Sequence, residues 1–252
     1  MLVVCNGPFK SGSTWLYEIV RRLVEPEPVP PELLDPAWVP VETIPRDDLA
    51  QFVASRDLAA HDHVIKGHMD RPRSVRFLVE SPDVVLVDIK RDLRDVTVSS
   101  FHHFRALGGK LGFATFPEYY WYAGRYYAAG VANHHRRWAG LTDATVEYEA
   151  LLTDFESEVS KLATVLGRPT STERLGTIRE QVGIKELRAQ YADSGISRIQ
   201  SSQFFREGSL GGWVDYFDEQ MLADIERLGE SWLTPSERLR WAIRSRDFRE
   251  KF

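Results

Sequence analysis

The feature that most constrains the fold is a short apolar run, Leu2–Cys5, which leads at once into a glycine-containing loop. A β-branched run of this length predicts a buried strand. After the loop, apolar residues recur at helical spacing from Trp15 to Val24, which predicts an amphipathic helix with Ser13 or Thr14 as its cap. The chain therefore begins with a strand, a loop and a helix.

The same alternation continues along the chain. Further strands are predicted at 63–66, 84–89 and 145–148, and helices in the second half of 113–138 and at 151–166. Another helix is predicted after 90–92, and it contains Val96, Val98, Phe101 and Phe104. Strands that alternate with helices favour one α/β domain over 1–252, with a central parallel sheet flanked by helices. Within it, we expect a proline-rich excursion at 26–60 that covers an acceptor pocket or links elements, and an amphipathic C-terminal helix at 232–252.

Composition excludes several classes of protein. A formal charge of −5 over 252 residues argues against broad nucleic-acid binding, which usually requires a basic domain. Cys5 is the single cysteine, so it cannot form an internal disulfide, and we expect it to lie in the core. No Cys/His spacing resembles a zinc site. No apolar stretch reaches the roughly 18 residues of a membrane span. We therefore expect a cytoplasmic protein with no metal.

The loop from Gly7 to Trp15 has the features of a phosphate-binding loop. Between a strand and a helix, such a loop directs backbone N–H groups and a helix N-terminus at one point. The spacing of Gly7 and Gly12 matches the start of an ATP-binding P-loop, but Ser13 occupies the place of the Walker lysine, and Lys10 lies inside the loop. An ordinary tight turn is the alternative for this segment alone.

Three motifs in order resemble those of the PAPS-dependent cytosolic-type sulfotransferases, where PAPS is 3′-phosphoadenosine 5′-phosphosulfate. Lys10–Trp15 (KSGSTW) is similar to their first cofactor loop, and Arg91–Ser99 (RDLRDVTVS) to their second motif. Phe205–Trp213 (FREGSLGGW) resembles their C-terminal loop, with Glu207 and Gly212 in place of the usual lysine and aspartate. A negative charge at Glu207 predicts weaker cofactor affinity.

The resemblance implies a P-loop-like three-layer fold and a set of cofactor contacts. The first loop would hold the 5′-phosphosulfate, with Lys10 on the bridging oxygen and Trp15 stacked on adenine. Arg91 and Ser99 would bind the 3′-phosphate, Tyr148 would reach the adenine, and a loop at 200–215 would close over the cofactor. The implied cofactor-binding residues are Lys10, Ser11, Gly12, Ser13, Thr14, Trp15, Arg91, Ser99, Tyr148, Arg206, Glu207 and Gly208.

Lys66-Gly67-His68 resembles the segment of this family that carries the catalytic base. His68 follows a predicted strand, where parallel sheets place their ligands. The resemblance implies that His68 takes a proton from the acceptor while Lys10 and Lys66 balance negative charge, leaving 3′,5′-adenosine bisphosphate as product. The adjacent pairs His102-His103 and His134-His135 are interpreted as solvent or pocket-rim residues.

Several alternatives stay open from the sequence. The acceptor is expected to be a small molecule with a hydroxyl or amine, and the aromatic run at 113–127 either lines its pocket or belongs to the core. The C-terminal segment packs on its own domain, covers the pocket or meets a second subunit in a homodimer. A P-loop kinase that uses ATP and a catalytically silent nucleotide-binding relative are the rival functions.

Overall fold

The computed structural model describes residues 1–36, 41–55, 60–106, 113–192 and 210–251. The chain divides into two compact units. The first unit comprises Met1–Arg91 with Arg137–Ser197, and the second comprises Asp92–Arg136 with Arg198–Phe252. The prediction of a single domain over the whole chain stays a prediction.

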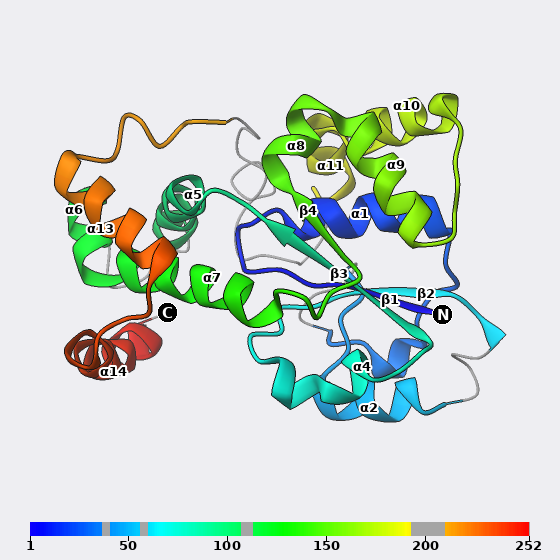
Figure 1. Cartoon of the computed structure of the whole chain (residues 1–252), viewed down its shortest axis with the longest axis horizontal. Helices are drawn as coiled ribbons and strands as arrows, with labels where there is room; N and C mark the ends of the chain where they lie inside the picture. The colour runs from blue at the N-terminus through cyan, green and yellow to red at the C-terminus, as the bar shows by residue number, and fades with distance from the viewer. Residues whose placement is uncertain (37–40, 56–59, 107–112, 193–209, 252) are drawn as a thin grey trace. The chain divides into compact units, whose positions relative to one another are not determined.

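A parallel sheet lies at the centre of the first unit. Its strands are β1 (Leu2–Cys5), β2 (His63–Lys66), β3 (Val84–Lys90) and β4 (Ala144–Glu147). They lie in the order β2-β1-β3-β4, and every pairing is parallel (Figure 1). All four carboxyl ends therefore meet at one edge of the sheet, which confirms the predicted α/β class.

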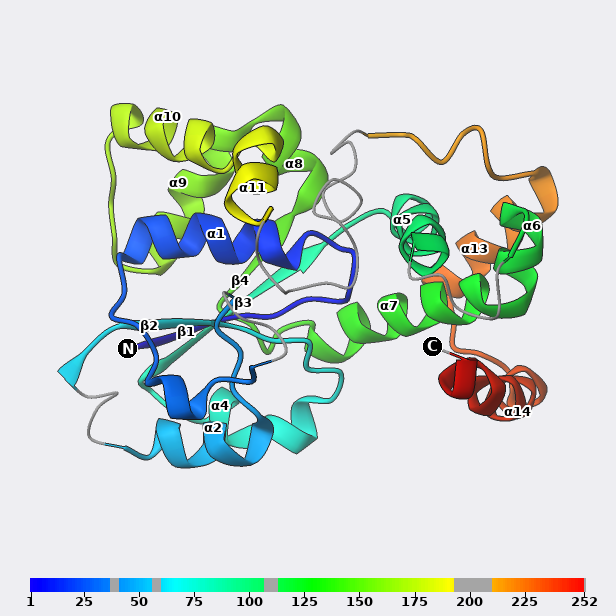
Figure 2. The same ribbon diagram turned by 180° about the vertical axis from the view of Figure 1, so that it is seen from behind.

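Helices cover both faces of this sheet, as Figures 1 and 2 show. The helix α1 (Ser13–Val24) lies on one face with the helices of the segment that follows β4, and α2 and α4 lie on the other. The result is three layers. The remaining elements of this unit are η1 (Pro31–Leu33), α2 (Arg46–Val53), η2 (Pro72–Val75), α4 (Arg76–Val79), α8 (Tyr148–Thr153), α9 (Phe155–Val165), α10 (Thr172–Gln181) and α11 (Ile184–Gln190).

The core of the first unit explains why β1 is an uninterrupted apolar run. All four residues of β1 are fully buried. Leu2 and Val4 pack in a cluster with residues of α2 and α4, among them Leu49 and Leu78. Alternate side chains of a strand point to opposite faces, so Val3 and Cys5 face the layer that contains α1. A strand that is buried on both faces has a continuous apolar sequence, without alternating polar residues.

The second unit is helical. Aromatic residues of α5, α6 and η3 form its core with Met221 and Ile225. Its elements are α5 (Leu93–Ala106), α6 (Phe116–Tyr119), the π-helical η3 (Tyr120–Gly124), α7 (Arg125–Trp138), α13 (Glu219–Glu230) and α14 (Pro235–Lys251), of which α7 ends in the first unit. No helix among the described residues is long and apolar enough to cross a membrane.

Local chemistry accounts for the differences from the predicted elements. The helix α1 begins at Ser13, and its cap position is Gly12, which makes no side-chain capping bond. The helix predicted at 151–166 is two helices, separated by the non-helical backbone of Asp154. Helical structure in the aromatic region begins earlier than predicted, because Thr115 and Glu118 form a capping box at the start of α6.

Candidate functional site

The loop between β1 and α1 is built to receive an anion. It opens on the N-terminus of a 12-residue helix whose first turn has no acidic residue and whose cap position supplies no side-chain bond. The first N–H groups of such a helix and its dipole favour negative charge. Inside the loop, the Ser11 hydroxyl donates to the Pro8 carbonyl over 2.5 Å, so this hydroxyl organises the loop itself.

Positive φ angles occur at Gly7, Lys10 and Gly12 of the loop. Lys10 has φ 67° and Gly12 has φ 97°. A side chain at Gly12 would be doubly disfavoured, because an added Cβ would lie 2.6 Å from Cδ2 of Tyr148. Lys10 is not glycine, so its ammonium group is held in this loop at some cost in backbone strain. Such strain is typical of residues that act at a site.

His68 lies beside this loop because β2 pairs with β1. The register places Lys66 opposite Cys5, and His68 follows two residues later. His68 Nδ1 lies 2.7 Å from the Gly7 carbonyl oxygen, and Nε2 lies 3.1 Å from Nζ of Lys66. Because a carbonyl only accepts, Nδ1 carries the hydrogen. In the neutral ring, Nε2 therefore holds the lone pair.

Lys66 is a buried cation in this site. Its side chain lies at the end of β2, and only 4% of the residue is exposed. Burial lowers the pKa of Lys66 from 10.5 to about 8, and the nearby Cys5 acts weakly in the other direction. A charge in a poorly solvated place interacts strongly with any anion that reaches it. The site thus holds Lys66 next to the nitrogen of His68 that can accept a proton.

Asn6 is a residue of the site that the sequence did not single out. It is fully buried, and its Oδ1 accepts a hydrogen bond from the Met69 N–H over 2.9 Å. The Met69 carbonyl in turn accepts from Nε1 of Trp138 over 2.6 Å. The segment that carries His68 is therefore held from both sides. Nothing in the local sequence signals this role, because the partner of Asn6 lies 63 residues further along the chain.

Arg91 and Tyr148 meet at the ends of β3 and β4. The Cζ atom of Arg91 lies 4.1 Å from the centroid of the Tyr148 ring, and its Nη1 donates to the Lys10 carbonyl over 3.2 Å. Trp15 meets the Tyr148 ring edge-on, with centroids 5.4 Å apart. The structure thus brings together four of the residues that the sequence singled out, Lys10, Trp15, Arg91 and Tyr148, which come from different parts of the chain.

Two buried nitrogens in this group suit a ligand with phosphate and a flat ring. Nε of Arg91 and Nε1 of Trp15 are buried, and neither has a hydrogen-bond partner among the described residues. Buried polar groups are almost always satisfied, so each such group calls for a partner. A guanidinium is suited to phosphate, and the partly exposed indole of Trp15 offers an apolar face to a base. The donor set therefore fits a nucleotide phosphate.

Other predicted site residues belong to the second unit. Ser99 lies on α5 and is partly exposed, while Arg206, Glu207 and Gly208 fall outside the residues that the structure describes. The end of their motif is held on α5, since the Gly211 N–H donates to Oδ2 of Asp95 over 3.1 Å. The Arg94 guanidinium also lies 3.9 Å from the centroid of a ring of Trp213.

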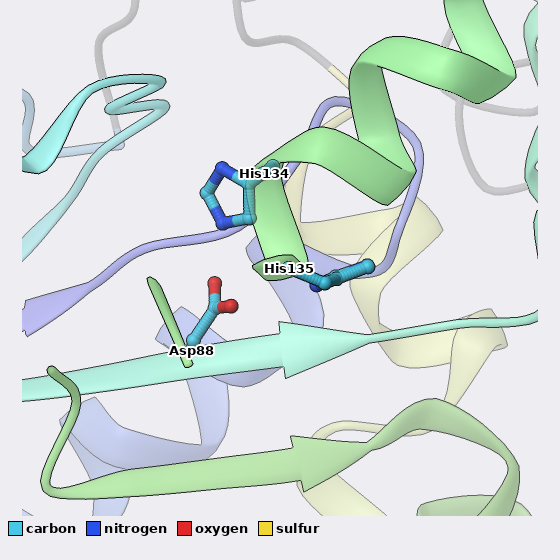
Figure 3. Close-up of side chains that lie close together, drawn as sticks. All are labelled: Asp88, His134 and His135. Carbon is cyan, nitrogen blue, oxygen red and sulfur yellow. The ribbon is translucent and has the colours of Figure 1, made fainter. Parts of the chain in front are cut away.

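The histidine pairs are less exposed than the sequence indicated. His103 and His134 are buried, so their interpretation as solvent or rim residues is wrong. The rings of His134 and His135 lie nearly perpendicular near the end of α7, with centroids 5.4 Å apart. Figure 3 draws them together with Asp88, which lies on β3 of the first unit. We assign no metal to these residues.

The aromatic run at 113–127 belongs largely to the core of the second unit. Phe116, Tyr119 and Tyr120 are buried, and the latter two are fully inaccessible. The Tyr119 hydroxyl lies 2.6 Å from Oγ of Ser100, and the Tyr120 hydroxyl donates to Asp224 over 3.0 Å. Of the two interpretations left open by the sequence, the core holds for these three rings. Trp121 and Tyr122 are partly exposed.

The fold and the site together define a class of protein. A strand–loop–helix phosphate site, without a Walker lysine, lies beside a lysine–histidine pair at the carboxyl edge of a parallel sheet. Ligands of open α/β sheets bind at that edge. The arrangement therefore suits a group-transfer enzyme whose donor carries phosphate.

Comparison with known proteins specifies the class. The model of the sulfotransferase domain family matches residues 3–237. The chain belongs to this family, and it is a sulfotransferase of the PAPS-dependent type. It is 25% identical to human sulfotransferase 1E1 over 230 residues, which cover 86% of this chain and 78% of that protein.

Two further comparisons agree. The chain is 28% identical to flavonol 4′-sulfotransferase of Flaveria chlorifolia over 267 residues, with 89% of this chain and 76% of that protein covered. Among solved structures, mouse sulfotransferase SULT7A1 complexed with PAP matches with a TM-score of 0.65 at 19% identity. That match covers 90% of this chain and 81% of the mouse chain, and it supports the fold.

Proposed function

We propose that this chain transfers the sulfuryl group of PAPS to a hydroxyl or amine of a small acceptor, with His68 as the general base. The observation that carries the proposal is the orientation of the His68 ring. Its Nδ1–H is bound to the Gly7 carbonyl, so the lone pair is on Nε2, which lies 3.1 Å from Nζ of Lys66 and would take the proton of the acceptor. Because Gly7 belongs to the phosphate loop, the base is fixed to the loop that would hold the donor.

The donor would be held by residues at the carboxyl edge of the sheet. Lys10 and the N-terminus of α1 would bind the 5′-phosphosulfate, and Trp15 would cover the adenine. Arg91 would bind the 3′-phosphate together with Ser99 and the segment of Arg206, Glu207 and Gly208. The proposal is supported by the buried, unpartnered nitrogens of Arg91 and Trp15 among the described residues. A 3′-phosphate site would distinguish PAPS from ATP.

The reaction would be an in-line displacement. The acceptor oxygen attacks sulfur as its proton passes to Nε2 of His68, and the bond between sulfur and the bridging oxygen breaks. The electron pair of that bond leaves with the bisphosphate. Lys10 and Lys66 would counter the charge that spreads over the equatorial and leaving oxygens, as in phosphoryl transfer. None of these roles requires a metal.

The acceptor is proposed to be a small aromatic or aliphatic alcohol. One curated relative is named for a flavonol, a phenolic compound. The net charge of −5 disfavours a highly sulfated polyanion, because repulsion would oppose its approach. The cytoplasmic location, the homodimer and the independence of a metal stay predictions.

Calorimetric titration tests the donor. We expect the wild type to bind 3′,5′-adenosine bisphosphate more tightly than ATP with magnesium, and Arg91→Ala to lose most of that preference. Arg179→Ala is the matched control, because Arg179 pairs with Glu156 on the surface. Preference for ATP with magnesium in the wild type would overturn the proposal in favour of a kinase. Binding of neither nucleotide would also contradict the proposal.

A further inference from the structure

Arg91 and Tyr148 are placed against each other by the sheet itself. Arg91 directly follows β3 and Tyr148 directly follows β4. The two strands pair in parallel with Lys90 opposite Glu147, so the next residue of each strand emerges at the same level. The guanidinium lies 4.1 Å from the ring centroid, and Tyr148 is 7% exposed. A cation this close to a poorly solvated ring is attracted by the negative face of the ring.

A second contact fixes the same guanidinium from the phosphate loop. Nη1 of Arg91 donates to the Lys10 carbonyl over 3.2 Å, and the left-handed backbone at Lys10 sets the direction of that carbonyl. Nε of Arg91 is buried and has no hydrogen-bond partner in the described part of the chain. The guanidinium is thus held by one ring and one carbonyl, and it keeps a buried N–H that an anion can use.

The ring of Tyr148 is itself held in place. Its Cδ2 side lies over Gly12, where a Cβ would come within 2.6 Å, and Trp15 meets it edge-on at 5.4 Å. Phe155 packs on Trp15, with centroids 6.3 Å apart. A ring fixed in this way gives the long, rotamer-rich arginine side chain one preferred position before any ligand arrives. Ordering a side chain in advance lowers the cost of binding.

We propose that Tyr148 is a positioning residue for Arg91, and that it thereby determines selectivity for a nucleotide with a 3′-phosphate. The inference rests on the proposed function, in which Arg91 binds that phosphate. It differs from the role that the family resemblance implies, a contact between Tyr148 and the adenine. In our proposal the face of the Tyr148 ring positions the Arg91 guanidinium, and the Tyr148 hydroxyl is not required.

The two roles predict different results for two ligands. If Tyr148 contacts the adenine, it strengthens the binding of 3′,5′-adenosine bisphosphate and of 5′-AMP equally, since both contain adenine. If Tyr148 positions Arg91, it strengthens only the binding of the bisphosphate, since 5′-AMP lacks the 3′-phosphate. The informative quantity is therefore the dissociation constant of 5′-AMP divided by that of the bisphosphate. Both constants are measured by calorimetry at one salt concentration, because salt screens exposed charges.

We expect Tyr148→Phe to keep the ratio of the wild type and Tyr148→Leu to lower it by about tenfold, as for a largely desolvated cation–π contact. Phe52→Leu is the matched control, because Phe52 is a buried ring in the core cluster that contains α2 and α4, and its ratio should equal that of the wild type. Equal weakening of both ligands by Tyr148→Leu, at an unchanged ratio, would overturn the inference.

A second series covers the case in which Tyr148→Leu does not fold. Tyr148→Met keeps a long apolar side chain without a ring, and the same fall in ratio is expected. Arg91→Gln removes the cation, so adding Tyr148→Met to it should change the ratio no further. A further fall in that background would contradict the proposal. A wild type that shows no preference for the bisphosphate would instead overturn the proposed function.

Discussion

Nζ of Lys66 lies 3.1 Å from Nε2 of His68, inside a site where Lys66 is almost completely buried. Burial lowers the pKa of Lys66 to about 8 from an ordinary 10.5. A folded-state pKa below the unfolded value means that the folded protein holds this proton less tightly. The difference corresponds to a cost of about 3 kcal/mol at neutral pH.

Lys66→Met should therefore stabilise the protein at pH 7 by up to about 3 kcal/mol while abolishing turnover. Between about pH 8 and pH 10.5 the unfolded chain binds a proton at Lys66 that the folded chain has released, so wild-type stability rises with pH. The difference in unfolding free energy between Lys66→Met and the wild type should therefore shrink over that range. Urea unfolding of both proteins from pH 7 to 10 measures it, and a constant difference would contradict the burial cost.

Replacement of His68 tests the base. His68→Ala should lower kcat by about 10²- to 10⁴-fold, the usual contribution of a general base. Binding of the bisphosphate should be retained, because the proposed role of His68 is toward the acceptor. His61→Ala is the matched control, since His61 is exposed and precedes β2. Full activity of His68→Ala would exclude it as the base.

Asn6→Ala should disturb the segment that carries His68. The change leaves the partly buried Met69 N–H without its acceptor, which costs about 1 kcal/mol of unfolding free energy. A displaced base should also lower kcat by about 10- to 100-fold with little change in bisphosphate affinity. Gln51→Ala, at an exposed position on α2, is the control and should change neither quantity. Chemical denaturation and steady-state kinetics provide the readouts.

Gly12→Ala should be destabilising and should weaken bisphosphate binding. The substitution places a side chain at φ 97°, and its Cβ meets the Tyr148 ring at 2.6 Å. Gly176→Ala is the opposite case, because Gly176 lies inside α10 with nothing within 4 Å of an added Cβ. It should be neutral or stabilising by about 0.5–1 kcal/mol. Equal effects of the two substitutions would show that the loop geometry is not constrained as described.

Arg125→Met tests the second unit. Arg125 donates to Asp224 and Glu237 over 2.6 and 2.7 Å, and each of these side chains is about one-tenth exposed. Removing one member of such a group leaves buried charge and should cost about 3–5 kcal/mol. Arg179→Met, in an exposed pair with Glu156, should cost about 0–1 kcal/mol. Thermal unfolding distinguishes the two.

Acid sensitivity should change with the same variant. Burial acts to raise the pKa of Glu237, but hydrogen bonds from Thr234 and Arg125 outweigh it and lower the pKa to about 2. The resulting stability is fully present above about pH 4.5 and is lost as pH falls toward 2. Without Arg125, the folded-state pKa of Glu237 should be higher, so less stability is lost in acid and the loss ends at a higher pH. Circular dichroism during acid titration would detect the shift, and coincident curves would contradict the assignment.

The sheet and the phosphate loop could be predicted because their signals are local. A strand buried on both faces is an apolar run, as at Leu2–Cys5, and a loop that needs left-handed backbone shows its glycine, as at Gly12. Arg91 and Tyr148 could be singled out because each follows a strand. Parallel pairing then brings the two residues to one edge of the sheet.

What the sequence did not indicate depends on contacts between distant segments. Glu18 falls among the polar positions of the predicted helix, yet it is fully buried, because Arg22 and the Tyr191 hydroxyl bond to its carboxylate. Asn6 likewise gains its role from Met69. In both cases the partner is set by tertiary packing, which periodicity within one segment does not encode.

The burial of Cys5 allows the opening of the first unit to be measured by thiol labelling. It is the single cysteine of the chain, it lies in β1 at the centre of the sheet, and burial raises the pKa of its thiol. A thiol reagent can reach it only when the sheet opens, because thiol reactivity requires both access and the thiolate. The rate of its labelling would therefore report how often the first unit opens, and a bound nucleotide should slow that rate without any added probe.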